Sequence, residues 1–344
     1  MSEATPVPVM VEARGMTRRF GSVAAVEGLS LSVPAGEIFG FIGPNGAGKT
    51  TTIRILATLD LPTEGSARIA GHDVVDEPEA VRDLMGYMPD AFGVYDGITV
   101  AEYLEFFAAA YNIHGQQRRK VVNDVLELTD LTFKATAEVN SLSRGMQQRL
   151  SIARVLLHDP KVLLMDEPAS GLDPRARIEI RELLKELKRM GKTILISSHI
   201  LHELSELCNT VGIIERGKLL FAGTVREALI RAKVGHIIHI GVVDRIAQAA
   251  ELLAKVPGVK RVALIDGETN VLTSGASNGQ AKPARGAAPV NRQLLHITFD
   301  ETGGHNYTDL PNVLVNHGFR LTKFAEEAVN LETAFMRLTK GMVQ

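Results

Sequence analysis

Residues 43–50 read Gly-Pro-Asn-Gly-Ala-Gly-Lys-Thr and fill every fixed position of the phosphate-binding pattern G-x-x-x-x-G-K-[ST]. The apolar run 37–42 before them suits a buried strand, and residues 51–56 after them begin a helical pattern. In the order strand, loop, helix, backbone N–H groups and a helix N-terminus both face the phosphates. This stretch therefore predicts an α/β fold that binds a nucleoside triphosphate. A glycine turn that binds nothing is disfavoured by these flanks.

Individual roles follow from the pattern. Lys49 is expected to reach the β- and γ-phosphates, and the Thr50 hydroxyl to ligate Mg²⁺. Glycines allow the backbone to turn its N–H groups toward the anion. The predicted phosphate contacts are Gly43, Pro44, Asn45, Gly46, Ala47, Gly48, Lys49, Thr50 and Thr51.

A second apolar run, residues 162–165, ends in two adjacent carboxylates, Asp166 and Glu167. At the end of a buried strand, Asp166 is placed to hold Mg²⁺ through water and Glu167 to polarise the attacking water. The alternative, an ordinary surface pair, is disfavoured by the apolar residues before it. A further strand, 193–198, delivers His199 at its end, although a lone histidine is usually structural.

Residues 142–146 read Leu-Ser-Arg-Gly-Met, and with them the chain resembles the ATP-binding cassette (ABC) ATPases, the nucleotide-binding subunits of ABC transporters. The resemblance covers about residues 10–225. It implies a P-loop ABC ATPase domain over 9–225, with a RecA-like core, an antiparallel β subdomain and a helical subdomain at about 91–158. The matching features, in the family's order, are Phe20, the phosphate loop, Asp90, residues 142–146, the carboxylate pair, residues 170–173 and His199.

The resemblance also implies how the site works. Phe20 would stack on adenine, and Ser143 and Gly145 would contact the γ-phosphate of ATP held by the opposite subunit. His199 would clamp the γ-phosphate beside the water that Glu167 activates. Two cassettes would face head to tail as a homodimer, with ATP sandwiched between them, and would drive a separately encoded membrane permease.

The chain departs from the family's usual pattern in two places, the signature and Asp90. The usual signature is Leu-Ser-Gly-Gly-Gln, whereas this chain has Arg144 and Met146. A basic-Gly-Met variant is similar to what many exporter subunits carry, which favours export of an unknown substrate. Asp90 stands where the family generally has glutamine, so the predicted metal ligands are Thr50, Asp90 and Asp166. The alternative is that Asp90 merely caps the turn after Pro89.

Composition limits the function further. The 344 residues, 45% of them hydrophobic, suffice for one large domain and a smaller one. No apolar run approaches the roughly 18 residues of a membrane span, and the N-terminus does not resemble a signal peptide. We therefore expect a cytoplasmic protein, peripheral at the inner face of the membrane through its permease. A net charge of −2 argues against nucleic-acid binding, and the single cysteine, Cys208, is expected to serve packing.

Beyond residue 225 the cassette motifs stop, and residues 226–344 predict a small ferredoxin-like α+β accessory domain. Residues 273–291 are poor in large apolar side chains and predict a disordered loop. His236 and His239 are interpreted as solvent-facing strand residues, because no third metal ligand is evident. The predicted elements are strands 236–241, 259–265, 270–273, 293–299 and 319–324, and helices 243–255, 307–316 and 330–340.

Aromatic residues concentrate in the predicted helical subdomain. One stripe at helical spacing is interpreted as core, and it comprises Tyr103, Phe106, Phe107, Ala110 and Tyr111. Phe92 and Tyr95 lie outside its register and are the candidates for contact with a permease helix.

The alternative function is that of a soluble ABC ATPase acting in translation, DNA repair or chromosome maintenance. Such proteins usually need two cassettes, a long coiled coil or zinc cysteines, and this chain has one phosphate loop, no long heptad run and one cysteine. A P-loop GTPase or kinase is disfavoured because no Asn-Lys-x-Asp motif occurs. A regulator without catalysis is disfavoured by the presence of Glu167 and His199.

Overall fold

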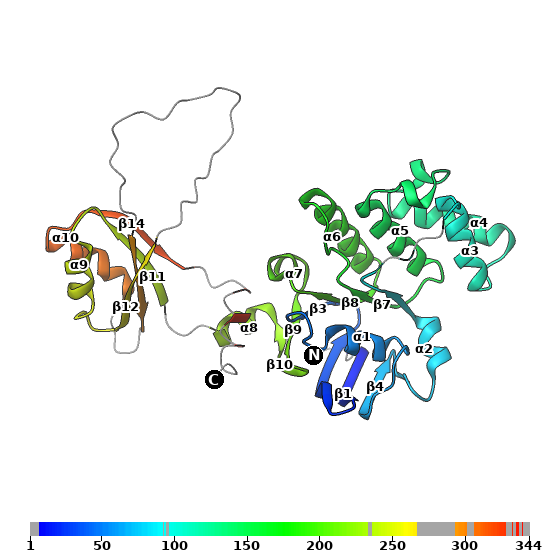
Figure 1. Cartoon of the computed structure of the whole chain (residues 1–344), viewed down its shortest axis with the longest axis horizontal. Helices are drawn as coiled ribbons and strands as arrows, with labels where there is room; N and C mark the ends of the chain where they lie inside the picture. Colours follow the sequence, from blue (N-terminus) through cyan, green and yellow to red (C-terminus); the bar gives the residue numbers. More distant parts are fainter. Residues whose placement is uncertain are drawn as a thin grey trace, which may run out of the picture. The chain divides into compact units, whose positions relative to one another are not determined.

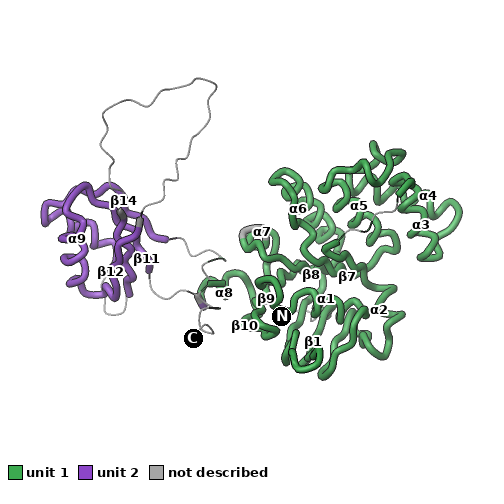
Figure 2. The backbone as a smooth tube through the Cα atoms, viewed as in Figure 1, with its two compact units in different colours: residues 1–230, 330–344 green, residues 231–329 purple. Residues whose placement is uncertain are grey.

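The computed structural model describes residues 7–91, 93, 96–232, 236–266, 293–300, 306–327, 332, 335–336 and 339. The chain divides into two compact units, one of residues 1–230 and 330–344 and one of residues 231–329 (Figures 1 and 2). The sequence predicts a boundary after residue 225, whereas this division places residues 226–230 and 330–344 with the first unit. Consistent with it, the partly buried Phe335 packs against the core of the first unit.

The first unit is built on a six-stranded sheet of order β10-β9-β3-β8-β7-β6. Its five strands from β9 to β6 are parallel, and β10 joins β9 as an antiparallel edge. All residues of β3, β7 and β8 are buried, as expected for parallel strands covered on both faces. The strands are β3 (Ile38–Ile42), β6 (Met85–Met88), β7 (Val162–Asp166), β8 (Thr193–Ser198), β9 (Thr210–Glu215) and β10 (Lys218–Thr224).

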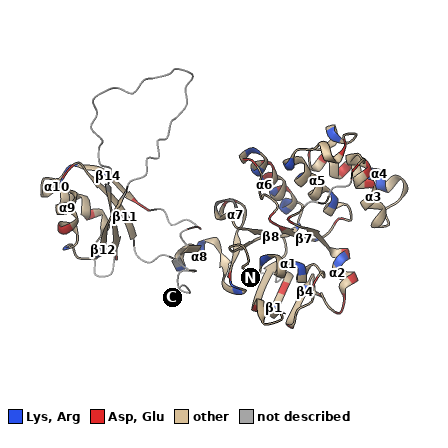
Figure 3. Cartoon of the chain, in the orientation of Figure 1, with Lys and Arg blue, Asp and Glu red and all other residues tan. Residues whose placement is uncertain are grey.

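Charged side chains gather on helices such as α6 (Pro174–Arg189) (Figure 3), whereas β3, β7 and β8 carry no charge except Asp166. Asp173 caps α6 by accepting a hydrogen bond from the N–H of Ala176 at 2.9 Å, and Pro174 follows at the first helical position. One apolar face of α6 is buried, and it comprises Ile180, Leu183, Leu184 and Leu187. The remaining helices of this core are α1 (Lys49–Leu56), α2 (Pro78–Leu84), α7 (Leu201–Leu207) and α8 (Val225–Ala232).

A second, antiparallel sheet of the first unit has the order β2-β1-β4-β5. Its strands are β1 (Val9–Phe20), β2 (Val23–Pro34), β4 (Glu64–Ile69) and β5 (His72–Asp73). Strands β1, β2 and β4 form one apolar core together with residues of the six-stranded sheet and α1. The predicted antiparallel β subdomain is therefore present. None of the helices in the described part of the chain has the length and apolar character needed to cross a bilayer.

The helical subdomain contains α3 (Val100–Ala110), α4 (Gly115–Leu128) and α5 (Arg144–Leu156), with short 3₁₀ turns η1 (Thr132–Lys134) and η2 (Val139–Ser141). Thr99 and Glu102 form a capping box that starts α3.

The predicted aromatic core stripe of α3 is largely wrong. Tyr103 is fully buried and Phe107 partly buried, but Phe106 is 58% exposed, Tyr111 is 42% exposed and Ala110 is exposed. The buried face instead follows helical spacing from Val100, a residue outside the stripe. Phe92 and Tyr95 lie outside the described residues.

The second unit holds a four-stranded antiparallel sheet of order β12-β13-β11-β14. Helices α9 and α10 pack on one face of this sheet over a separate apolar core. The predicted strand 270–273, the loop 273–291 and most of helix 330–340 lie outside the described residues. The elements are β11 (His236–Val242), α9 (Ile246–Leu253), β12 (Val259–Asp266), β13 (Gln293–Phe299), η3 (Tyr307–Asp309), α10 (Leu310–Asn316) and β14 (Leu321–Glu326).

Candidate nucleotide-binding site

The phosphate loop leaves the end of β3 and turns back onto the start of α1. Gly46 and Gly48 have φ values of 79° and 106°, which glycine adopts without the penalty of a side chain. Lys49 is only 5% exposed, and its Nζ donates hydrogen bonds to the carbonyl oxygens of Gly43 at 2.6 Å and Pro44 at 3.2 Å. The loop thus wraps around a positive charge, and a phosphate in it would meet this charge beside the loop's N–H groups.

A serine of the neighbouring strand β8 holds the Asp166 carboxylate and the backbone of Glu167 at the end of β7. Asp166 is 1% exposed and accepts a hydrogen bond from the Ser197 hydroxyl at 2.5 Å. The same hydroxyl accepts a hydrogen bond from the backbone N–H of Glu167 at 3.0 Å. Ser197 was missed as a site residue in the sequence analysis. The parallel register that pairs it with Asp166 is the only signal that could have found it.

Glu167 and His199, predicted from separate stretches, lie in contact. The imidazole Nδ1 of His199 is 2.6 Å from Glu167 Oε2, while Glu167 Oε1 is 3.3 Å from the Nζ of Lys49. Glu167 also has a φ of 48°, the left-handed conformation that non-glycine residues adopt rarely. Such conformations persist where the surroundings hold them, and they concentrate at functional sites. The carboxylate is therefore fixed between a cation and an imidazole.

These groups share one cavity of about 430 Å³ at the carboxyl ends of the parallel strands. It is lined by Ala25, Pro44, Asn45, Gly46, Ala47, Gly48, Lys49, Thr50, Thr51, Asp90, Asp166, Glu167, Ser170 and His199. The phosphate-loop residues predicted from the sequence from Pro44 to Thr51 therefore lie together with both predicted catalytic side chains.

Asp90, which follows β6, brings a third carboxylate to this cavity. Burial raises the pKa of Asp90 above its usual range, and the neighbouring charges of Glu167 and Asp166 raise it further. The three carboxylates and the Thr50 hydroxyl form a set of oxygen donors, the kind that hard divalent cations prefer. Their mutual repulsion would be relieved by such a cation.

The signature residues lie elsewhere in the same chain. Ser143 caps α5, accepting a weak hydrogen bond from the N–H of Met146 at 3.4 Å. A Cβ on Gly145 would come within 2.9 Å of the Cβ of Ala176, so α5 and α6 approach closely there. Ser143 and Gly145 line a different cavity, with Arg144 and Gly171, and are not among the residues lining the phosphate-loop cavity.

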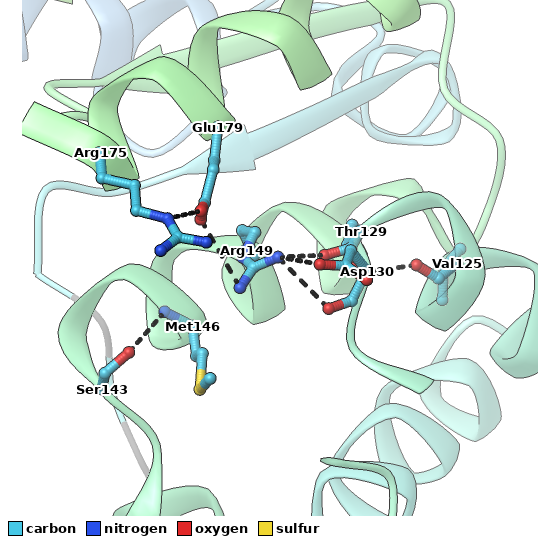
Figure 4. A network of polar contacts seen from close by, with 8 residues as sticks. All are labelled: Val125, Thr129, Asp130, Ser143, Met146, Arg149, Arg175 and Glu179. Carbon is cyan, nitrogen blue, oxygen red and sulfur yellow. Dashed lines mark hydrogen bonds and ion pairs between the residues drawn. The ribbon is translucent and has the colours of Figure 1, made fainter. Parts of the chain in front are cut away.

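Arg149 ties the signature helix to its neighbours (Figure 4). Its side chain donates to the carbonyl oxygens of Thr129 at 3.4 Å and Asp130 at 3.3 Å, and to the Asp130 carboxylate at 3.0 Å. The Nη2 of Arg149 also lies 3.8 Å from Oε2 of Glu179, a residue of α6. Arg149 is 8% exposed, so these contacts compensate a buried charge and set the position of α5. No motif in the sequence predicts this role for Arg149.

Phe20 stands at the end of β1 and is 50% exposed. The guanidinium of Arg18 lies 4.6 Å from the centre of its ring. Phe20 does not line the phosphate-loop cavity, so its contact with adenine stays a prediction. Cys208, in contrast, fulfils the packing role expected of it: it is buried, and burial raises the pKa of its thiol.

Comparison with known proteins agrees with this geometry. Residues 26–170 match the protein family described as ABC transporter. Nod factor export ATP-binding protein I of Paraburkholderia xenovorans is 39% identical over 260 residues, which is 75% of this chain and 84% of that protein. The probable multidrug ABC transporter ATP-binding protein YbhF of Escherichia coli is 36% identical over 222 residues; this match covers 64% of the chain but only 38% of YbhF.

A solved structure of an ATP binding subunit of an ABC transporter matches with a TM-score of 0.59 at 29% identity, covering 64% of this chain and 92% of that one. The chain therefore belongs to the ATP-binding proteins of ABC transporters. The resemblance drawn from the motifs is confirmed, and the chain is an ABC ATPase.

Proposed function

We propose that this chain is the ATP-hydrolysing subunit of an exporter and works as a homodimer beneath a separate membrane permease, which holds it at the inner face of the membrane. The observation that carries the proposal is the meeting of Lys49, Asp166, Glu167 and His199 in one cavity. The relatives named for Nod factor export and multidrug transport favour export. Neither name identifies the substrate of this chain.

Within the proposed reaction, Lys49 balances charge on the phosphates and Glu167 accepts a proton from the attacking water. The contact between Glu167 and His199 at 2.6 Å holds the two side chains together in the wall of the cavity that would receive the phosphates. Thr50, Asp90 and Asp166 are proposed as the Mg²⁺ ligands, directly or through water. When bound, Mg²⁺ supplies positive charge that offsets the charge developing on the phosphates.

The separation of the two half-sites supports the proposed homodimer. Ser143 and Gly145 line a cavity other than that of the phosphate loop. If these residues contact the γ-phosphate, a second copy of the chain must bring them there. Phe20 is proposed to stack on adenine, since its exposed ring is available to a flat ligand.

For the second unit we propose a ferredoxin-like fold. The order of elements β11-α9-β12-β13-α10-β14, with the strand order β12-β13-β11-β14, supports this assignment. We further propose that this unit is an accessory to the ATPase.

Purification from membranes under mild detergent tests the export function. We expect the chain to come with a polytopic permease that stimulates its ATPase activity. The double variant Phe92→Ser and Tyr95→Ser is expected to lose the permease while keeping basal hydrolysis. If the chain comes instead with ribosomes, DNA or chromosome proteins, the soluble ABC ATPase is the better assignment.

Asp90→Gln is expected to retain ATPase activity but to need more Mg²⁺ for half-maximal rate, because an amide is a weaker ligand than a carboxylate. Asp90→Ala should lower turnover as well. The raised pKa of Asp90 sets the sign with pH: acidification protonates the carboxyl, so the Mg²⁺ requirement should rise in the wild type and rise less in Asp90→Gln.

Titration of Mg²⁺ against the ATPase rate at several pH values measures this effect. Asp83→Asn is the matched control, since Asp83 is an exposed carboxylate on α2 outside the cavity. Superimposable curves for the wild type, both Asp90 variants and the control would leave Asp90 a turn residue.

A further inference from the structure

Two histidines stand side by side on the sheet of the second unit. His239 on β11 and His296 on β13 are direct partners in the antiparallel register, and their ring centroids are 5.2 Å apart. The neighbours of each along its strand, such as Ile238 and Leu295, are fully buried in the core beneath α9 and α10. Because side chains alternate along a strand, both imidazoles lie on the face opposite these helices.

A carboxylate completes the group. Glu327 follows β14 directly, and its backbone N–H donates to the carbonyl oxygen of Ile237 at 2.7 Å, which fixes it beside β11. Its Oε2 lies 3.2 Å from the Nε2 of His239. One ligand atom each from His239, His296 and Glu327 lies within 4.8 Å of the others. No local sequence pattern brings further ligands to His239, but the pairing of distant strands supplies them.

We propose that His239, His296 and Glu327 form a binding site for a divalent transition metal, with Zn²⁺ as the preferred ion. Imidazole nitrogen and carboxylate oxygen are ordinary zinc ligands at about 2.0–2.2 Å, and in a tetrahedron such atoms are roughly 3.3 Å apart. The separation of 3.2 Å between Nε2 and Oε2 already fits. The wider separations, none above 4.8 Å, lie within reach of side-chain rotation.

The side chains of His239, His296 and Glu327 are partly buried, so a bound ion could exchange with solvent. The side chains of His239 and Glu327 are 19% and 32% exposed, and His296 is also intermediate. Three protein ligands leave the fourth position of a zinc site to water or to another donor. Mg²⁺ prefers oxygen ligands, whereas imidazole nitrogen favours transition metals. A site with two imidazoles is therefore not a Mg²⁺ site.

His236 offers an internal comparison. It lies on the same strand and also faces a carboxylate, with Nδ1 2.5 Å from Glu326 Oε1, but its ring stacks on Tyr307 at 4.5 Å. It is therefore a histidine paired with glutamate and an aromatic ring, whereas His239 is paired with glutamate and a second imidazole. If His239 and Glu327 formed only an ordinary hydrogen bond, the two histidines should respond alike to metal.

The test is calorimetric titration of Zn²⁺ into the full, chelator-treated chain without nucleotide, with Co²⁺ absorption as a second probe of tetrahedral coordination. We expect a site that each of His239→Ala, His296→Ala and Glu327→Gln weakens at least about tenfold, since even residues supporting a ligand change affinity by that much. Zn²⁺ should also raise the unfolding temperature of the wild type and not of these variants.

His236→Ala and His199→Ala are the controls, and both should bind Zn²⁺ at this site as the wild type does. Glu327→Gln preserves the shape of the side chain, so its loss of binding would not reflect misfolding. The proposal is overturned if all three ligand variants bind Zn²⁺ like the wild type, or if His236→Ala loses binding equally. It is also overturned if only His199→Ala loses binding, because the ion would then occupy the nucleotide cavity.

Discussion

Replacing Glu167 with glutamine is expected to slow ATP hydrolysis by about 10²- to 10⁴-fold while ATP binding stays close to that of the wild type. The amide cannot accept the proton of the attacking water, but it has the same length and the same Cβ. Glutamine should therefore fit the left-handed backbone conformation of residue 167, where φ is 48°, as well as glutamate does. Lys49, the proposed partner of the phosphates, should keep its bonds to the loop carbonyls of Gly43 and Pro44.

Steady-state ATPase rates and equilibrium binding of ATP measure the two effects separately. Glu182→Gln is a suitable control, because this exposed residue of α6 pairs with Lys185 outside the cavity. Turnover within tenfold of the wild type would show that another group activates the water. ATP should also trap the variant as a dimer in solution, and a monomer at saturating ATP would contradict the shared site.

The phosphate loop and the carboxylate pair could be predicted to meet because each directly follows an apolar run, and the carboxyl ends of parallel strands share one edge of a sheet. His199 also follows such a run, but its role beside Glu167 was predicted only from the resemblance to the ABC ATPases. The glycines and Lys49 also belong to one motif, G-x-x-x-x-G-K-[ST], whose spacing is specific for phosphate binding. These parts of the site depend on short-range sequence patterns.

The parts that could not be predicted depend on long-range pairing. Ser197 is one of three polar residues in the buried strand β8, and only its register with Asp166 gives it a role. His239 and His296 face each other because β11 lies beside β13, which no local pattern specifies. The stripe on α3 was misassigned for a related reason. Helical spacing fits several faces of a helix rich in apolar residues, and the packing of the subdomain selects the face that includes Tyr103.

Gly48→Ala is expected to weaken ATP binding by about 100-fold, because both the backbone conformation at this position and the space around it require glycine. Its φ of 106° lies beyond the left-handed region that other residues tolerate. A Cβ at this position would lie 2.5 Å from the carbonyl oxygen of Ala25. That oxygen belongs to the backbone of β2, so it cannot rotate away as a flexible side chain would.

The two penalties act on the residue that caps α1 immediately before Lys49. A left-handed non-glycine residue costs about 1–2 kcal/mol and overpacking about 1–3 kcal/mol. We expect unfolding free energy to fall by about 2–5 kcal/mol if the loop keeps its shape. If the loop moves instead, Lys49 and the N–H groups of α1 leave their positions. A loss of about 3 kcal/mol in binding would correspond to roughly 100-fold weaker affinity for ATP.

The variant Gly46→Ala separates the cost of the backbone conformation from the cost of a steric clash. Gly46 also has a positive φ, 79°, but a Cβ there would meet no atom within 4 Å. This variant should therefore carry only the backbone penalty and should bind ATP much better than Gly48→Ala. Urea unfolding and equilibrium ATP binding of the two variants measure the difference. Equal affinities would mean that the loop adapts to the added methyl group and that close approach to Ala25 is not what the phosphate loop requires.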